Sequence, residues 1–221
     1  TEKEPSKSGV LGLVCAALGI DRSDWSSLEP LTHLRLGVRI DNPGILKRDF
    51  HTAQNVIRAD GKGHQEVAVT ERYFLSDASF LVGLEDRDPD KNLLREIQEH
   101  LRNPTWPLFL GRTSFVPGDP VQIVDGLVKP NIEEALESHP YAILEFRARS
   151  LERMGVLVPN ENGDAERATR ARLRLMIESD TAEGSIYMDQ PIASFADRKF
   201  GSRYVVSKII EKEVTYVSES S

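Results

Sequence analysis

The chain has 221 residues, of which 39% are hydrophobic and 29% charged, a composition typical of a soluble globular protein and not of a disordered one. The net charge of −7 argues against a protein that coats nucleic acid non-specifically. Residues 1–80 carry 10 Lys/Arg and 11 Asp/Glu, so the acidity is concentrated later and an anion-binding surface is expected in the first third. No apolar run approaches the roughly 20 residues of a membrane span. The single cysteine, Cys15, excludes a disulfide framework and favours a reducing cytoplasm.

The first element is a predicted helix over residues 8–18. Ser8 is placed as its N-cap and Gly19 as the glycine that ends it. A second short helix is predicted over residues 23–31. Residues 33–40 then alternate cleanly between two faces, which predicts a half-buried strand with a basic outer face. The inner face holds Leu34, Leu36, Val38 and Ile40, and the outer face holds His33, Arg35 and Arg39.

A projecting β-hairpin is predicted over residues 53–72. Two short β-prone runs, 56–58 and 67–70, flank a turn signal at residues 60–63. These runs are short and polar, so the hairpin buries little by itself. Such an arm needs a partner.

The remaining elements follow from hydrophobic spacing and from turn residues. A buried strand is predicted over 73–75 and 79–84, and an amphipathic helix over 90–102. An apolar strand at 108–110 precedes Arg112, and a short helix spans 132–138. Strands are predicted at 141–149, 172–178 and 203–210, loops at 153–168 and 180–202, and a frayed tail at 218–221.

This order predicts an α+β fold. A ferredoxin-like βαββαβ unit accounts for it if a first strand stands before Thr1, so about one strand and a loop are expected to be missing. The predicted division is a ferredoxin-like domain at residues 1–120, including the hairpin, and a smaller β-rich region at 121–221.

Several catalytic chemistries lack their motifs in the sequence. The five histidines are not spaced as metal ligands, and HExxH and CxxC are absent. Nucleotide loops of the GxxxxGK[ST] and GxGxxG types are absent, as is GxSxG, and Cys15 lies inside an apolar helix. We expect no metal, no cofactor and no catalytic nucleophile.

Basic segments offer a different chemistry. Lys7 and Ser8 stand at a helix N-terminus, where free N–H groups favour an anion. Residues 47–52 mix cations, an aromatic ring and an imidazole, a mixture that suits single-stranded RNA. The pair Arg72–Tyr73 and the segment beginning at Arg112 add similar groups. A solvated helix cap and charged loops remain open as simpler interpretations of each segment.

Five ordered stretches carry a family resemblance: residues 5–13 with 17–20, then 37–41, 48–52, 70–80 and 107–114, with a weaker one at 192–206. With them the chain resembles the RAMP superfamily of CRISPR proteins, and within it the CasD-type subunits of the type I-E surveillance complex, Cascade. The family's opening strand and loop are absent here. Members often have two arginines where this chain has Arg112–Thr113.

The resemblance implies a RAMP (RRM-like) ferredoxin-like domain whose hairpin is a thumb, and a non-catalytic, cytoplasmic role in antiviral defence. It implies a subunit that binds the 5′ handle of CRISPR RNA and caps one end of the ribonucleoprotein complex. Implied partners are the CasC backbone subunit, the large CasA subunit and, through the assembled complex, target DNA. Carried over by segment, the RNA contacts would be Lys7, Ser8, Arg39, Arg48, His51, Arg72, Tyr73 and Arg112.

An alternative is a metal-independent endoribonuclease that processes precursor CRISPR RNA. Such cleavage needs a base, an acid and a cation around one phosphate. His51, Tyr73 and Lys47 supply these residue types. A protein-only interaction module is the third reading, and it leaves Arg48, Arg72 and Arg112 without a role.

Overall fold

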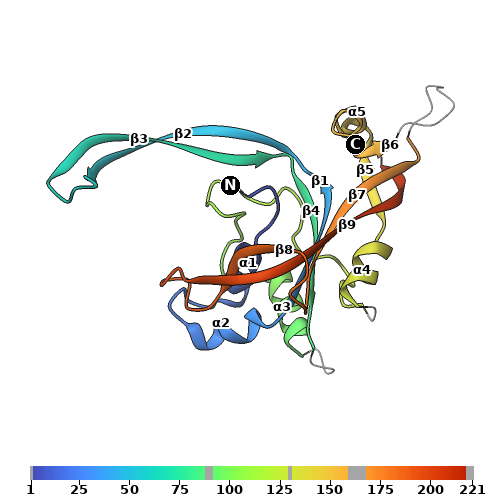
Figure 1. The fold of residues 1–221 in the computed structure, drawn as a ribbon, viewed down its shortest axis with the longest axis horizontal. Helices are drawn as coiled ribbons and strands as arrows, with labels where there is room; N and C mark the ends of the chain where they lie inside the picture. The colour runs from blue at the N-terminus through green and yellow to red at the C-terminus, as the bar shows by residue number, and fades with distance from the viewer. Residues whose placement is uncertain (1, 88–91, 129–130, 159–167, 218–221) are drawn as a thin grey trace.

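The computed structural model describes residues 2–87, 92–128, 131–158 and 168–217 and confirms the predicted α+β class (Figure 1). A mixed sheet forms the centre, helices cover parts of both its faces, and a long hairpin arcs away from it. The strand order is β4 (Ser79–Glu85), β1 (Arg35–Asn42), β7 (Arg170–Glu178), β9 (Phe200–Val217) and β5 (Tyr141–Leu144). Two further strands join it: β6 (Leu157–Val158) pairs with β7, and β8 (Ser185–Pro191) pairs with β9.

One face of the sheet is covered by α1 (Lys7–Leu18), α2 (Trp25–Thr32) and α3 (Asn92–Arg102). Ser6 caps α1, because its Oγ accepts the Gly9 N–H at 3.1 Å, and Gly19 ends the helix at φ 76°. The predicted cap at Ser8 was therefore wrong by two residues. Apolar side chains of these helices, together with Leu34 just before β1, form one core: Leu11, Val14, Cys15, Leu28, Leu31, Leu34 and Ile97.

The opposite face is covered by α4 (Ile132–Ser138), as predicted. Two glycines on neighbouring strands, Gly37 and Gly83, lie directly beneath it. A Cβ on Gly37 would lie 2.6 Å from the Leu136 side chain, and one on Gly83 would lie 3.1 Å from Ile132. The absence of side chains there lets α4 pack close to the sheet. Because α4 covers this face, Arg39 is fully buried and the predicted basic outer face of this strand was wrong.

The hairpin consists of β2 (Ile45–Ile57) and β3 (His64–Ser76), paired in continuous register from Ile45↔Ser76 to Ile57↔His64. It confirms the predicted arm but is longer than residues 53–72. The predicted strand that joined 73–75 to 79–84 is interrupted at Asp77, whose φ of 61° turns the chain from β3 into β4. In the described residues, β2 and β3 pair only with each other.

Other boundaries differ from prediction. Residues 108–110 are irregular, so Arg112 does not follow a strand. The predicted strand 141–149 is β5 followed by a 3-10 turn (Glu145–Arg147) and α5 (Ala148–Arg153), whose Leu151 enters a second core with Tyr141 and Leu173. Strand β8 lies in a region predicted as loop, and β9 is longer than predicted. Most of the predicted 153–168 loop and the tail at 218–221 lie outside the described residues.

Strands from both ends of the chain share the sheet, because β1 pairs with β7. The division at residue 120 stays a prediction, and the sheet is continuous across it. Within the described residues no strand precedes α1, and β4 has a hydrogen-bonded neighbour, β1, on one side only.

Candidate nucleic-acid interface

The hairpin presents two chemically different faces. Side chains alternate along each strand, and cross-strand partners share a face. From the register, we name as the aromatic face Leu46, Arg48, Phe50, Val67, Val69, Glu71 and Tyr73. The polar face comprises Lys47, Asp49, His51, Thr70, Arg72 and Phe74. The predicted contacts on this arm therefore divide into two pairs, Arg48 with Tyr73 and His51 with Arg72.

On the aromatic face a cation lies over an exposed ring. The Arg48 guanidinium carbon is 4.9 Å from the centroid of Phe50, and its Nη1 is 3.2 Å from the Glu71 carboxylate. Phe50 is 59% exposed and Tyr73, the cross-strand partner of Arg48, is 43% exposed. Exposed rings beside a planar guanidinium are the groups on which unstacked RNA bases stack.

The polar face offers donors for phosphate. Lys47, His51 and Arg72 are all exposed, and Asp49 lies opposite Arg72 in the register. Residues 45–76 contain five Lys/Arg and four Asp/Glu, a net charge of +1, whereas the whole chain carries −7. The arm is thus more basic than the rest of the molecule.

Arg112 lies at the root of the hairpin, in an irregular loop instead of at the predicted strand end. Its Nη2 donates to the Tyr73 carbonyl at 3.3 Å, and its guanidinium lies 5.2 Å from the Phe115 ring centroid. Phe115 in turn contacts Phe74 with ring centroids 5.1 Å apart. Arg112 is half-buried, and its contacts attach this loop to β3.

The N-terminus of α1 does not offer the predicted anion site. Lys7 is 2% exposed, and its Nζ donates to Glu178 at 2.9 Å. Asp189 of β8 accepts the Lys7 N–H at 2.7 Å, so a carboxylate of the protein already occupies this helix end. Burial is the main cause of the lowered pKa of Lys7. The Ser8 hydroxyl lies 3.3 Å from that of Ser6, and Lys7 is withdrawn from any surface ligand.

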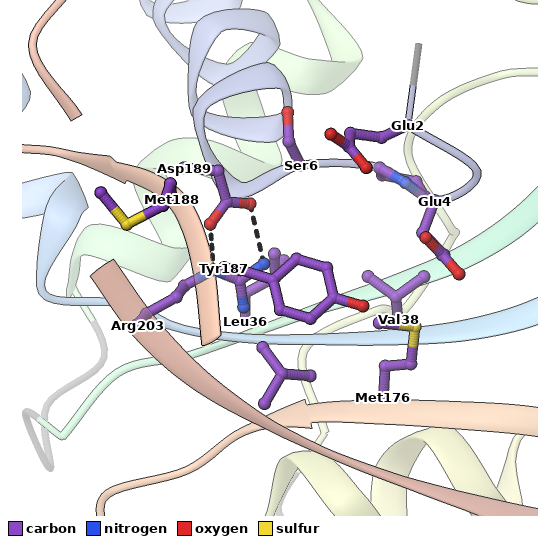
Figure 2. A pocket seen from close by; sticks show the side chains of 12 residues that line it. Glu2, Glu4, Ser6, Leu36, Val38, Met176, Tyr187, Met188, Asp189 and Arg203 are labelled. Atoms are coloured by element: carbon purple, nitrogen blue, oxygen red, sulfur yellow. Dashed lines mark hydrogen bonds and ion pairs between the residues drawn. The ribbon is translucent and has the colours of Figure 1, made fainter. Parts of the chain in front are cut away.

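A small cavity of about 100 Å³ lies beside this helix end (Figure 2). Apolar side chains such as Val38 and Met176 line it, and Arg203 and Asp189 form a bidentate ion pair at 2.6 and 2.9 Å in its wall. Small-molecule sites typically enclose about 300–1,000 Å³. The cavity is below that range, and its buried polar groups satisfy one another.

Arg39 is a structural residue in this fold. Its guanidinium donates to both Asp41 carboxylate oxygens at 2.7 and 3.0 Å. It also donates to three main-chain carbonyls at the end of α4, those of Leu136, His139 and Pro140, at 2.6–3.1 Å. A buried guanidinium with this many partners joins α4 to β1, and its predicted RNA contact is incompatible with that position.

The residues named for cleavage do not converge. Lys47 and His51 project from the polar face, whereas Tyr73 projects from the aromatic face. A base and an acid on opposite sides of one hairpin cannot flank the same phosphate. The structure contains no group of three or more metal-ligating side chains among the described residues. No described helix is long and apolar enough to span a membrane.

Comparisons with known proteins agree with one another. A family model described as CRISPR-associated protein (Cas_Cas5) matches residues 1–206. The CRISPR system Cascade subunit CasD of Escherichia coli (strain K12) is 35% identical over 127 residues, which are 52% of this chain and 55% of that protein. The match thus spans about half the length of this curated relative.

Two solved structures share the fold. One, titled "Crystal structure of Cas protein", has a TM-score of 0.68 and 36% identity, and the match covers 96% of this chain and 84% of the other. The second, titled "CRISPR RNA-guided surveillance complex", has a TM-score of 0.71 and 26% identity, with coverage of 97% and 83%. Their titles concern CRISPR proteins and an RNA-guided complex.

Proposed function

Because the chain belongs to the Cas5 family of CRISPR-associated proteins, we propose that it is a non-catalytic structural subunit of a type I-E surveillance complex. In this role it binds the 5′ handle of CRISPR RNA, caps one end of the complex and acts in the cytoplasm. Target DNA is reached only through the assembled complex. The names of two relatives, Cascade subunit and RNA-guided surveillance complex, support this assignment.

The observation that carries the proposal is the exposed two-faced hairpin. Its aromatic face supplies Arg48, Phe50 and Tyr73 for stacking on unpaired bases, and its polar face supplies His51 and Arg72 for phosphates. A single RNA strand that crosses the arm meets both faces. Arg112 completes the site at the hairpin root. Ser8 is half-buried beside Ser6 and adds at most a peripheral contact.

Protein partners fit other exposed apolar surfaces. The distal hairpin exposes Ile57, Val67 and Val69, which we assign to the neighbouring CasC subunit. The irregular segment from Trp106 to Leu127 exposes further large apolar side chains, which we assign to CasA. Large exposed apolar side chains gathered in one segment are typical of protein interfaces.

The test is RNA binding with two matched double variants. Arg48→Gln with Arg72→Gln removes one cation from each face of the hairpin. Arg95→Gln with Arg102→Gln removes the same charge from exposed positions on α3. The measurement uses a labelled type I-E repeat RNA and the other complex subunits. The hairpin variant should retain about tenfold less RNA than the wild type, and the α3 variant should retain as much as the wild type. Equal retention by both variants would contradict the site.

The same gel tests the nuclease alternative. We expect intact RNA without metal. A cut product that ends in a 2′,3′-cyclic phosphate, and that is lost in His51→Ala, would overturn the non-catalytic assignment.

A further inference from the structure

Three arginines project side by side from β7, on the part of the sheet face that α1 leaves uncovered. Arg170, Arg172 and Arg174 alternate with the buried Ala171, Leu173 and Leu175, so all three share one face. They are 63%, 60% and 42% exposed. We call these three residues the arginine row.

The row begins at the hairpin root. Arg174 pairs in register with Ile40 of β1, two residues before the strand ends at Asn42. From there β7 runs beside β9 toward β6 (Figure 1). Any strand of RNA that leaves the root of the arm on this side would meet the arginine row next.

The spacing suits a chain of phosphates. A strand rises about 3.4 Å per residue, so alternate residues stand about 7 Å apart. This is of the same order as the distance between successive phosphates of an extended RNA strand. Each guanidinium is a planar fork that binds phosphate oxygens in pairs.

The arginine row faces carboxylates that a bound phosphate would have to displace. Arg172 and Arg170 share one carboxylate, that of Glu211, at 3.4 and 3.7 Å. Glu213 lies opposite Arg170 in the register, and Glu4 pairs with Arg174 from the cavity side. The pairs of Arg170 and Arg172 with Glu211 are exposed and therefore weak, so a phosphate can replace that carboxylate, whereas the pair of Arg174 with Glu4 is part-buried. Opposite Arg174, Ile209 is 63% exposed and offers apolar contact to a base.

We propose that the arginine row binds the phosphate backbone of single-stranded nucleic acid as a second contact surface, separate from the hairpin. The proposal extends the RNA-binding role proposed above. It adds the segment of RNA that continues from the hairpin root along β7.

The experiment measures binding of a fluorescein-labelled twelve-nucleotide oligouridine to the full chain across a salt series. The row variant carries Arg170→Gln, Arg172→Gln and Arg174→Gln. Its control carries Arg95→Gln, Arg102→Gln and Arg153→Gln, which remove the same charge from exposed positions elsewhere. Thermal unfolding establishes that each variant is folded.

The row variant should bind at least about tenfold more weakly than the control, with the slope of log K against log salt reduced by about 2 for three lost contacts. Glu211→Gln should tighten binding about threefold, because a competing carboxylate is removed. Equal affinity of the row variant and its control overturns the proposal. Polyglutamate, measured in the same way, is the second probe. If the row variant loses polyglutamate binding while its RNA binding is unchanged, the proposal is also overturned, in favour of an acidic peptide.

The hairpin variant Arg48→Gln with Arg72→Gln separates this proposal from the proposed function. If the hairpin variant weakens oligouridine binding and the row variant does not, the arginine-row proposal is wrong and the hairpin site stands. If only the row variant weakens binding, the hairpin site fails and the row stands. If the wild-type chain binds no oligouridine at low salt, the arginine row fails, and the hairpin site still depends on the repeat-RNA experiment with the other complex subunits.

Discussion

The carboxylate of Asp189 accepts the main-chain N–H of Lys7 at 2.7 Å, although the two residues stand 182 positions apart. The same carboxylate holds Arg203 in a bidentate pair, and the Lys7 ammonium reaches Glu178. Two cations and two anions therefore neutralise each other under the first turn of α1. Near the end of the chain, β8 and β9 supply groups that fix its first helix.

Removal of the Asp189 charge should destabilise the fold. Asp189→Asn keeps the side-chain shape but removes the bidentate anion of the buried Arg203 and leaves only Glu178 at 3.9 Å, which costs about 3 kcal/mol of unfolding free energy. Urea denaturation measures the change. Asp180→Asn is the control, because its pair with Arg87 is largely exposed and contributes about 0–1 kcal/mol. Similar losses in both variants would contradict a buried network.

Arg39→Lys should also lower the free energy of unfolding, although it keeps the positive charge. A lysine has three donors in place of a five-donor fork, so buried carbonyls at the end of α4 lose partners and stability falls by about 3 kcal/mol. Arg102→Lys, at an exposed position, should change it by less than about 0.5 kcal/mol. RNA affinity of the folded Arg39→Lys protein should equal that of the wild type. A selective loss of RNA affinity would return Arg39 to the binding site.

Acidification should weaken the fold through His139. Burial, followed by the neighbouring Arg39, holds the pKa of His139 below its usual 6.5, while Asp41 partly opposes this. The unfolded chain therefore binds a proton that the folded chain resists, and the stabilisation present above pH 6.5 is lost as pH falls toward the lower folded value. His139→Gln should lose less stability than the wild type between pH 7.5 and pH 5, measured by denaturant midpoints. Parallel profiles would exclude His139 as the source.

Shortening the hairpin should leave the body folded. Replacing residues 50–71 by an Asn-Gly turn joins Asp49 to Arg72, which already face each other in register. These residues pair only within the hairpin in the described part of the chain, so the thermal midpoint should change by only a few degrees. Assembly with the other subunits and RNA should be lost. A broad, non-cooperative transition would mean that the arm belongs to the core.

Local patterns in the sequence predicted the elements whose partners lie nearby. The alternation in residues 33–40, the short helix at 132–138 and the turn at 60–63 each required only neighbouring residues, and each element is found. The hairpin was predicted too short because residues 73–75 are apolar where β3 reaches the body, so they were assigned to a buried strand instead of to the arm.

The wrong predictions of site residues arose because some of these residues are buried by parts of the chain far away in sequence. Lys7 and Arg39 were predicted as surface cations, but Glu178 and Asp41 neutralise them inside the fold. Strand β8 was missed because Asp189 breaks its apolar alternation, and this aspartate is buried only because Arg203 meets it. The arginine row has a sequence signal, the alternation of residues 170–174, but only the exposed fractions of its side chains show that this face is uncovered.

The hairpin also has a consequence for handling the isolated protein. Each of its strands is 13 residues long and, in the part of the chain that the structure describes, hydrogen-bonds on one side only. Each therefore presents an edge that pairs with no further strand in the described residues, flanked by exposed apolar side chains, which is a template for edge-to-edge pairing between copies. The chain alone should self-associate as its concentration rises, and co-production with the subunit that covers the arm should keep it monodisperse.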